Sequence, residues 1–177
     1  MATPLLRIAT EADVPAIYGM VVELAVYERE PDAVAITEEQ LREDGWGEHR
    51  AFECFVAEDA ATGVCAFALF HPVYSTWEGR SLYLEDLYVK PSHRSRGIGT
   101  ALLRRVAQEA VRRGCARLDW SVLIWNEPAL RVYEHIGARR MEEWRRMRLS
   151  EHALAAFAAA PPAGEPSVGL DAPVYTS

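Results

Sequence analysis

The first third of the chain shows a strand pattern followed by two helix patterns. Residues 5–9 (LLRIA) form a short apolar run that predicts a strand. Thr10 and Asp13 then form the T-x-x-D pattern of a capping box. The apolar residues behind this box recur at helical spacing, which predicts a helix with one buried face: Val14, Ile17, Val21, Leu24 and Ala25. Thr37 followed by Gln40 marks the start of a second helix, which ends near Gly45.

The middle of the chain predicts three strands and a long helix. Residues 52–58 (FECFVAE) alternate between apolar and polar side chains. Residues 64–74 continue as a strand after the turn DAATG, so the two segments predict a hairpin. Residues 81–89 (SLYLEDLYV) predict a third strand. Residues 97–113 place apolar side chains on one stripe and arginines on the other, which is typical of an amphipathic helix.

The last third predicts two more strands and two short helices. Residues 116–125 (ARLDWSVLIW) predict a buried strand, and residues 126–138 a helix with Asn126 as its N-cap. A weak alternation in residues 145–150 (RRMRLS) predicts a final strand, followed by an alanine-rich helix over residues 151–160.

The order β-α-α-β-β-β-α-β-α-β-α predicts an α/β fold with a mixed, mostly antiparallel sheet flanked by helices. One β-α-β crossover runs through residues 81–122. We expect a single domain over residues 1–160 and a Pro/Gly-rich C-terminal tail over residues 161–177, because 177 residues suit one domain and the tail has a low-complexity composition.

Composition excludes several classes of protein. No apolar run approaches the roughly 18 residues that a membrane helix needs. The N-terminus has no basic region followed by an apolar stretch, so we expect a cytoplasmic protein without a membrane partner. The three cysteines and five histidines form no CxxC, HExxH or HxH group, and we therefore expect neither a disulfide framework nor a metal site.

The net charge of −7 is unevenly divided along the chain. Residues 1–90 carry 6 basic and 17 acidic residues, whereas residues 91–177 carry 13 basic and 9 acidic residues. The acidic half suits a cationic ligand and the basic half an anionic one, although solvated surface charge explains the same counts. The acidic total and the absence of interleaved basic and aromatic residues argue against a nucleic-acid partner.

The stretch HRSRGIG, residues 93–99, lies between the third predicted strand and the following helix. It lacks the lysine of a Walker-type loop. A dinucleotide fingerprint fits in part, because Gly97 and Gly99 follow a strand, open a helix and precede Asp119 by about 20 residues. However, Leu102 stands in place of the third glycine, and the loop is long for a tight turn. A nicotinamide site is therefore disfavoured.

The same stretch also fits the pattern R-x-x-G-x-G, from Arg94 to Gly99. Glycines allow a backbone to approach an anion closely. The free N–H groups of the first helical turn and the helix dipole favour negative charge there. Arg94 or Arg96 can add a charge-assisted hydrogen bond. In its strand–loop–helix setting, this pattern indicates a pyrophosphate-binding loop.

Several stretches resemble the spermidine/spermine (diamine) acetyltransferase family, within the GCN5-related N-acetyltransferase (GNAT) superfamily. They are RIATEAD, ELAVYERE, LREDGWGEH, LYLEDLYV and WNEPALRVYEHIGA, spread from residue 7 to about residue 150. The run W-N-E-P-x-x-x-x-Y, from Trp125 to Tyr133, is the most specific of them. The chain departs from the family at Ser95, where the family has a glycine, and in a shorter segment before Trp144.

The resemblance implies the GNAT acyl-CoA N-acyltransferase fold, acetyl-CoA as the cofactor and a homodimer. The residues it implies for cofactor binding are Leu87, Tyr88, Val89, Arg94, Ser95, Arg96, Gly97, Ile98, Gly99, Thr100, Asn126, Pro128, Ala129 and Tyr133. Among these, Leu87 and Val89 would act through backbone groups. The residues it implies for substrate binding are Tyr27, Glu28, Glu85, Asp86, Asp119, Trp120, Ser121, Glu142 and Trp144.

Two residues are candidates for the chemistry. A primary amine has a pKa of ~10.4 and must lose a proton before it can attack a thioester. Glu85 or Asp86, inside an apolar strand, can hold the ammonium and accept that proton directly or through a water. Adjacent strand residues point to opposite faces, so we expect at most one of the two to face a given site. The alternative interpretation is that one of them lies at a bulge or edge and is solvated. The resemblance implies Glu85 for the amine contact and Tyr133 as the proton donor to the leaving thiolate.

We therefore expect an acetyl-CoA-dependent N-acetyltransferase that acts on a primary amine of a small cationic substrate by direct attack, with a polyamine or diamine favoured. A lysine-like amino acid such as thialysine is the close alternative. A non-catalytic CoA-binding domain is a further alternative, but it would predict loss of Tyr133 or of the carboxylate pair, and both are present.

Overall fold

The structure, a computed structural model, describes residues 3–159 of the chain. The chain divides into two compact units, Met1–Val132 and Tyr133–Ser177, and each is described by itself. The predicted tail over residues 161–177 and the last residue of the predicted final helix lie outside the described residues.

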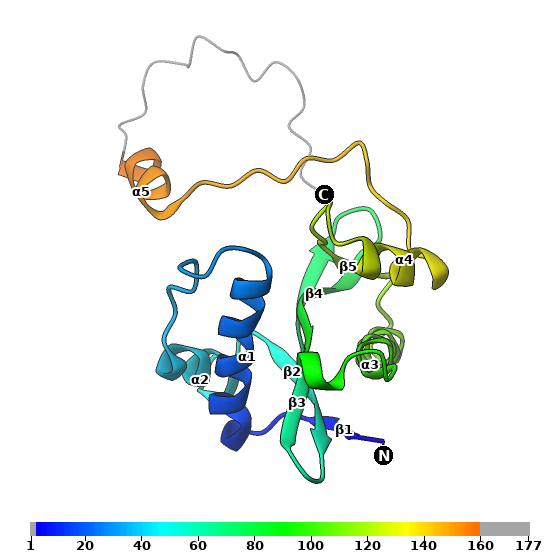
Figure 1. Ribbon diagram of the computed structural model, residues 1–177. Helices are drawn as coiled ribbons and strands as arrows, with labels where there is room; N and C mark the ends of the chain where they lie inside the picture. Colours follow the sequence, from blue (N-terminus) through cyan, green and yellow to red (C-terminus); the bar gives the residue numbers. More distant parts are fainter. Residues whose placement is uncertain (1–2, 160–177) are drawn as a thin grey trace. The chain divides into compact units, whose positions relative to one another are not determined.

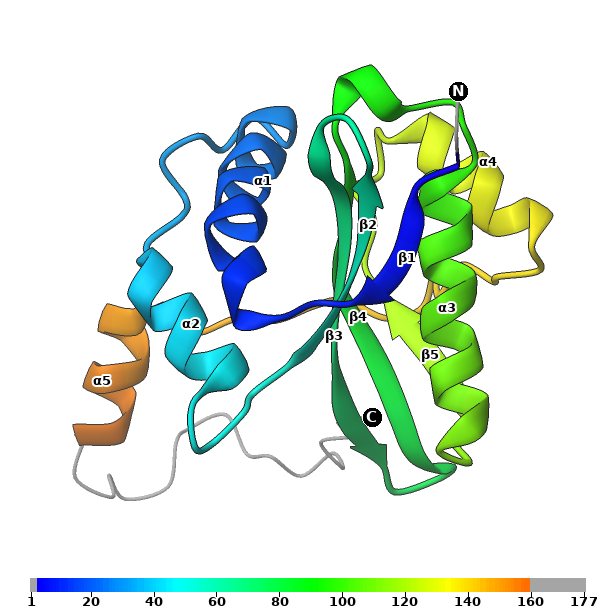
Figure 2. The same cartoon turned by 90° about the horizontal axis from the view of Figure 1, so that it is seen from below.

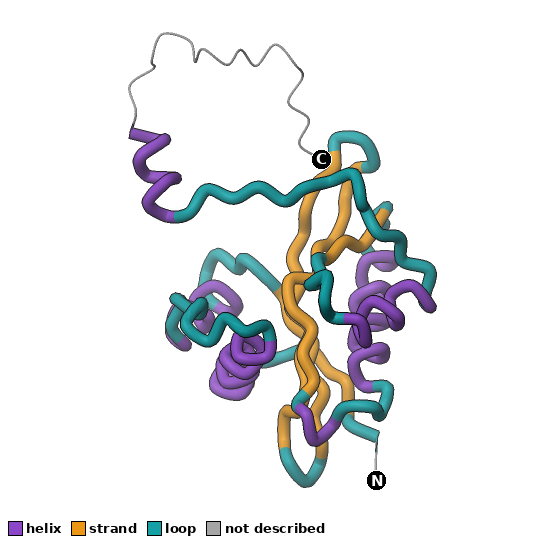
Figure 3. Tube along the Cα trace, turned by 45° about the horizontal axis from the view of Figure 1, so that its top comes forward, coloured by secondary structure: helices purple, strands orange, loops and turns teal. Residues whose placement is uncertain are grey.

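The first unit is built on a five-stranded sheet with the order β1-β2-β3-β4-β5 (Figures 1 and 3). The strands span Leu5–Ile8 (β1), Glu53–Asp59 (β2), Gly63–Ser75 (β3), Gly79–Val89 (β4) and Arg117–Trp120 (β5). Neighbours from β1 to β4 are antiparallel, and β5 runs parallel to β4. The mixed, mostly antiparallel sheet is confirmed, and so is the crossover.

Helices cover both faces of this sheet (Figure 2). On one face lie α1 (Val14–Tyr27), which follows a short 3-10 turn at Glu11–Asp13, and α2 (Glu38–Trp46). On the other face lies α3 (Ile98–Arg112), which connects β4 to β5 and is preceded by a 3-10 turn at Pro91–His93. The core beneath α1 and α2 joins helix and sheet residues that are nearly inaccessible to solvent, among them Ile17, Met20, Leu41, Phe67, Leu69 and Tyr88.

The start of α1 is fixed to the sheet by one ion-paired carboxylate. The guanidinium of Arg7, on β1, donates hydrogen bonds to both oxygens of Asp13 at 2.7 and 2.8 Å. The backbone N–H of Thr10 donates to the same carboxylate at 2.7 Å, as the predicted capping box requires. The Arg7 guanidinium lowers the pKa of Asp13 to about 2. Because Arg7 also donates to Glu58 of β2, the pair sets where α1 begins over the sheet.

Two predicted strands differ from the structure. Strand β5 ends at Trp120 instead of residue 125, because the chain turns there and the N–H of Asn126 donates to the carbonyl of Leu123 at 2.8 Å. The predicted final strand over residues 145–150 is wrong, since that segment forms no strand. A strand needs a neighbour for its backbone groups, and no strand of the described residues pairs with this segment.

The second unit begins within α4 (Glu127–His135) and includes α5 (Glu151–Ala159). The left-handed φ of +89° at Gly137 ends α4 where the sequence predicts its end. Arg140 then pairs with Glu134 of α4 at 2.6 Å. Among the described residues, no helix is both long and apolar enough to cross a membrane.

Candidate active site

Strand β4 contains a β-bulge at Glu85. Leu69 of β3 pairs with Asp86, but the next β3 residue, Phe70, pairs with Leu84. Glu85 is therefore an extra residue with no partner on β3. A bulge of this kind breaks the two-residue alternation of a strand and redirects the side chains around it.

The bulge brings both carboxylates of the strand to one face. Asp86 shares the face of its partner Leu69, which packs in the core beneath α1. Glu85 contacts His71, which lies two residues beyond Leu69 on β3 and hence on the same face. The expectation that at most one of the two carboxylates faces a given site is wrong for this bulged strand, whereas the alternative of a solvated carboxylate at a bulge agrees with Glu85, whose side chain is 46% exposed.

A third carboxylate, Glu28 at the C-terminal end of α1, completes an acidic cluster with Glu85 and Asp86. Burial, followed by the negative charges of Glu85 and Glu28, raises the pKa of Asp86 to about 6. Burial also raises the pKa of Glu28. Within residues 3–159, no arginine or lysine forms an ion pair with these three side chains. A cluster that is partly desolvated and lacks a basic partner is suited to a cationic ligand.

The start of α3 is open to an anion. Its N-cap is Gly97, which has no side chain to accept from the first turn, and whose φ of +75° is in the left-handed region. The first intrahelical bond is donated by Ala101 to the carbonyl of Gly97, so the N–H groups before it have no partner within the helix. At α2, by contrast, Thr37 accepts from Gln40 at 3.1 Å and caps the helix. The predicted pyrophosphate-binding loop, residues 94–99 and called the anion loop below, thus leads into a helix whose first backbone N–H groups have no partner within the helix.

The rest of the loop is held by its arginines. Arg94 donates from Nε to the carbonyl of Val89 at 2.9 Å, and Arg96 donates to the carbonyl of Ser92 at 3.0 Å. The guanidinium of Arg94 also lies 5.1 Å from the ring centre of Tyr27, which brings the loop next to the end of α1. Neither arginine pairs with a carboxylate in the part of the chain that the structure describes.

Ser95, the departure from the family pattern, has a φ of +62°. In this left-handed region a residue with a Cβ is strained by roughly 1–2 kcal/mol, whereas glycine is not. The loop therefore keeps the backbone shape that a glycine would adopt, and the departure affects its stability more than its path.

One edge of β4 is unpaired beside the acidic cluster. The ladder with β5 ends at the pair Leu84 and Trp120. From Asp86 to Val89, β4 pairs only with β3 among the described strands. Backbone groups there that point away from β3 are open to an extended ligand, except that the Val89 carbonyl already accepts from Arg94 at 2.9 Å. The backbone roles of Leu87 and Val89 stay predictions.

Two segments 99 positions apart meet at the end of α1. The hydroxyl of Tyr27 donates to Oδ1 of Asn126 at 3.2 Å, and the same oxygen accepts from the N–H of Ala129 at 3.4 Å. The ring of Tyr27 also lies 5.7 Å from that of Trp125. Asn126 is thus the N-cap of α4, as predicted, and the W-N-E-P motif lies next to α1.

The β5 residues predicted to contact substrate fall on both faces of the sheet. Asp119 shares a face with its β4 partner Tyr83, but it is paired with Arg117 at 2.7 Å, which offsets its charge. Ser121 lies within 2.7 Å of the hydroxyl of Tyr83 and belongs to the same face. Trp120 alternates to the opposite face. These substrate roles stay predictions, and Asp119 is already occupied by its arginine.

Tyr133, Glu142 and Trp144 belong to the second unit. Tyr133 lies on α4, and burial raises the pKa of its phenol above the ordinary value, so the phenol stays protonated at neutral pH. Glu142 and Trp144 line a small concavity formed by residues 139–144. The roles of all three stay predictions.

Sequence reasoning missed His71. Its Nε2 lies 3.4 Å from Oε2 of Glu85, and its ring lies 5.5 Å from that of Tyr83. Hairpin pairing predicts only that His71 is near the middle of β4. Its contact with Glu85 depends on the bulge, which the apolar pattern does not reveal.

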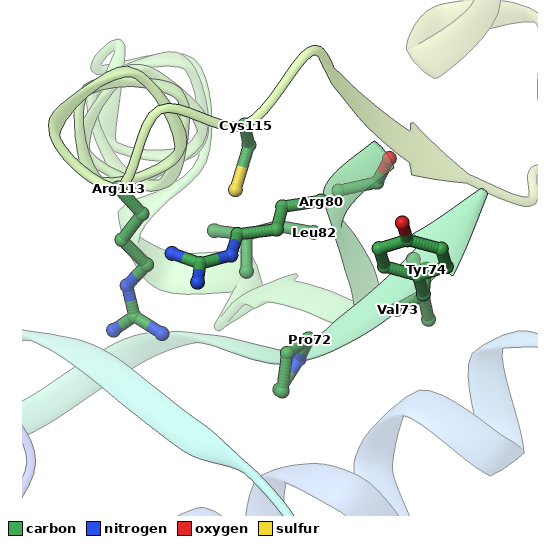
Figure 4. Close-up of a pocket in the computed structure, with 8 residues that line it drawn as sticks. Pro72, Val73, Tyr74, Arg80, Leu82, Arg113 and Cys115 are labelled. Atoms are coloured by element: carbon green, nitrogen blue, oxygen red, sulfur yellow. The ribbon is translucent and has the colours of Figure 1, made fainter. Parts of the chain in front are cut away.

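A groove of about 490 Å³ lies elsewhere on the first unit (Figure 4). It is at the other end of β4 and is lined by Pro72, Val73, Tyr74, Arg80, Ser81, Leu82, Arg113 and Cys115. None of the acidic cluster reaches it, and its charged residues are both arginines. This groove has no acidic side chain, so it is a poorer candidate for binding a cationic substrate than the acidic cluster beside the loop of residues 94–99.

The first unit thus has an acidic cluster at the bulge of β4 and, after the end of this strand, a start of α3 without a side-chain cap. The chain belongs to the acetyltransferase (GNAT) family, whose profile matches residues 17–138. The matched region contains the bulge, the glycine loop and the W-N-E-P motif. The family and the fold expected from the sequence are therefore confirmed, and the protein is an acetyltransferase.

Relatives share most of the chain. It is 42% identical over 164 residues to the thialysine N-epsilon-acetyltransferase of Sus scrofa, which covers 87% of this chain and 96% of the relative. It is 32% identical over 158 residues to the spermidine/spermine N(1)-acetyltransferase-like protein 1 of Homo sapiens, covering 84% of this chain and 23% of that protein. An integron cassette protein from the mobile metagenome of V. cholerae has the same fold, with a TM-score of 0.74 at 24% identity, covering 90% of this chain and 100% of that one.

The raised pKa of Asp86 predicts how the free energy of unfolding depends on pH. Its folded-state pKa of about 6 lies above the ordinary value of 3.8, so the ionised group opposes folding above pH 6. Asp86→Asn is therefore expected to stabilise the fold by about 1–3 kcal/mol at pH 8, and this gain should disappear as the pH falls to 4. Urea unfolding at both pH values measures it. Asp32→Asn, at an exposed loop carboxylate, is the control and should change little. Equal free energies of unfolding for Asp86→Asn and the unchanged protein at pH 8 would contradict the raised pKa of Asp86.

Proposed function

We propose that this acetyltransferase uses acetyl-CoA to acetylate a primary amine of a small cationic molecule. The acidic cluster of Glu28, Glu85 and Asp86 beside the open start of α3 is the observation that carries the proposal. A dianionic pyrophosphate and an ammonium group attract opposite partners; the acidic cluster lies at the bulge of β4, and the start of α3 follows the end of this strand.

The residues of the loop fit the pyrophosphate of CoA. The free N–H groups at Gly97 to Thr100 can donate to it, and Arg94 and Arg96 can add charge-assisted bonds. A Cβ at Gly99 would make only an ordinary van der Waals contact, 3.5 Å from a methyl group of Val89, so packing against β4 does not by itself require this glycine. The unpaired edge of β4, with Leu87 and Val89, suits the pantetheine arm. When bound, acetyl-CoA supplies the activated acyl group.

Glu85 is proposed to make the amine nucleophilic. Its side chain is 46% exposed, so it remains reachable by substrate and by water. The half-buried Asp86 and the exposed Glu28 hold the rest of the cation by charge. Glu85 takes one proton from the ammonium, directly or through a water, and leaves a neutral amine that attacks the carbonyl. No covalent enzyme intermediate is needed, which agrees with the burial of Cys54 and Cys65.

Tyr133 is proposed to donate the proton that the leaving thiolate requires. Its raised pKa keeps the phenol protonated until that step. The tyrosine of the W-N-E-P motif has this role in the resembling family, and its assignment here rests on the motif.

The two candidate substrates have different support. The relative in Sus scrofa acts, by its name, on thialysine, and it aligns over nearly its full length. Arg29 favours such an amino acid, because it stacks 4.6 Å above the ring of Trp125, follows Glu28 and has no carboxylate partner among the described residues. Its guanidinium could bind the substrate carboxylate. The polyamine alternative rests on the acidic cluster and the relative in Homo sapiens.

Homodimer formation and a cytoplasmic location are also proposed. The first rests on the resemblance and the second on the sequence composition. The non-catalytic alternative is not favoured by any contact in the structure.

A panel of amines with acetyl-CoA tests the proposed function. Release of free thiol is expected with lysine-like amino acids or with polyamines. Little release is expected with simple monoamines, which carry no second charged group. Turnover of polyamines alone would remove the role given to Arg29. No turnover of any amine, or tight binding of NAD(P) without binding of CoA, would overturn the proposal.

The proton donor is tested by Tyr133→Phe. The ring is kept and only the hydroxyl is lost, so kcat should fall by about 10²–10⁴-fold, a much larger effect than any change in CoA affinity. Tyr74→Phe is a matched control, because Tyr74 is 74% exposed at the far end of the β3–β4 hairpin. Unchanged turnover of Tyr133→Phe excludes the phenol as the proton donor.

A further inference from the structure

The catalytic carboxylate has a neighbour that neither the family motifs nor the sequence pattern assigns. His71 Nε2 and Glu85 Oε2 are 3.4 Å apart across the β3–β4 bulge. The other ring nitrogen, Nδ1, lies 3.4 Å from the carbonyl oxygen of Pro72. A carbonyl oxygen and an ionised carboxylate oxygen both only accept, so a neutral imidazole can donate to one of these two groups and not to both. Once Glu85 is protonated, it can donate to the lone pair of Nε2 while Nδ1 donates to the Pro72 carbonyl.

The ring of His71 is held in this orientation. It lies against the ring of Tyr83, with 5.5 Å between centroids and an interplanar angle of 36°. The hydroxyl of Tyr83 is 2.7 Å from Oγ of Ser121, which anchors that ring on β5. The ring of His71 thus packs against Tyr83, while its Nε2 lies next to the carboxylate of Glu85.

Water reaches His71 as well. Its side chain is 29% exposed, whereas Asp86 lies in the buried part of the cluster. The charged groups that act on Asp86, next to Glu85 in the chain, are the carboxylates of Glu85 and Glu28. Glu53, at the end of β2, is instead paired with Arg113 at 2.6 Å. A cationic imidazolium would therefore face carboxylates and no basic group in the part of the chain described.

We propose that His71 takes from Glu85 the proton that Glu85 removes from the substrate ammonium, and passes it to solvent. The inference rests on the proposed function. In the step, the Oε2–H bond of the protonated Glu85 breaks and its electron pair stays on the oxygen. The lone pair of Nε2 forms the new N–H bond, and the imidazolium then loses one proton to water. Glu85 returns to the carboxylate form for the next ammonium.

His71 acts through Glu85, so it is a positioning residue of the proton path and does not itself touch the substrate. A histidine suits the task because imidazole is the side chain that ordinarily gains and loses protons near neutral pH. A residue that only held Glu85 by a hydrogen bond would be replaceable by glutamine.

Three variants separate these roles. His71→Ala removes the ring, His71→Gln keeps a hydrogen-bonding group but cannot carry the extra proton, and His49→Ala removes an exposed histidine after α2 as a matched control. The amine found to be turned over by the unchanged enzyme is used for all, with kcat and KM measured from pH 6 to pH 9. CoA binding and thermal unfolding midpoints show whether each variant keeps its fold.

The proposal expects kcat near neutral pH to fall at least about tenfold in both His71→Ala and His71→Gln, with KM changed by less than about twofold. The loss should shrink as the pH rises, because hydroxide can then take the proton from Glu85. Added imidazole should restore His71→Ala, while imidazole should have no effect on His49→Ala.

Full kcat in His71→Gln overturns the proposal, whether or not His71→Ala folds. A loss in His71→Ala that imidazole does not reduce, or that is equal at all pH values, also overturns it. An unchanged enzyme that turns over no amine sinks the proposed function instead, so the two failures are distinguishable.

Discussion

A single inserted residue in β4 determines where the carboxylates of the candidate active site lie. In an unbroken strand, Glu85 and Asp86 would point to opposite sides of the sheet, one towards α1 and the other towards α3. The bulge places both on the α1 side, beside Glu28. Burial, followed by repulsion from the negative charges of Glu85 and Glu28, raises the pKa of Asp86 to about 6. The fold tolerates that cost where a cationic ligand would relieve it.

The same strand connects the acidic cluster to the anion loop. Beyond the bulge, β5 no longer pairs with β4, so one edge of the strand is open up to Val89. The chain then enters the loop that Arg94 ties to the Val89 carbonyl, and Gly97 starts α3 without a side-chain cap. A cofactor lying along the open edge would have its anionic part at the helix start and its reactive part near the carboxylates. The β4–β5 pairing ends at Leu84, and the bulge follows at Glu85, so the open edge and the acidic cluster lie on the same stretch of β4.

Most of the fold could be predicted from the apolar pattern, because each element buries one face. The capping residues Thr10 and Thr37 and the amphipathic stripe of α3 identified the helices within a few residues. The pattern failed where a strand depends on its neighbours. Residues 145–150 alternate but have no strand to pair with, and β5 ends early because the chain turns to reach Asn126. Alternation alone does not say whether a partner is present.

The site was predictable as a set of residues but not as a geometry. The motifs identified Glu85, Asp86, Asn126 and the glycine loop, whereas the bulge and the contact with His71 come from pairing between strands. Asp119 shows the opposite case: a carboxylate chosen by motif is paired with Arg117, two residues away on its own strand.

Asp86 is proposed to belong to a cluster of carboxylates whose excess negative charge is neutralised by the bound cationic ligand. Calorimetric titration of a dicationic amine substrate into the enzyme with CoA, in buffers of different ionisation enthalpy, measures the protons exchanged on binding. At pH 6, Asp86 is about half protonated, so binding should release up to about half a proton that is not released at pH 8 or by Asp86→Asn. The same proton exchange at pH 6 in Asp86→Asn and in the unchanged enzyme would contradict the claim.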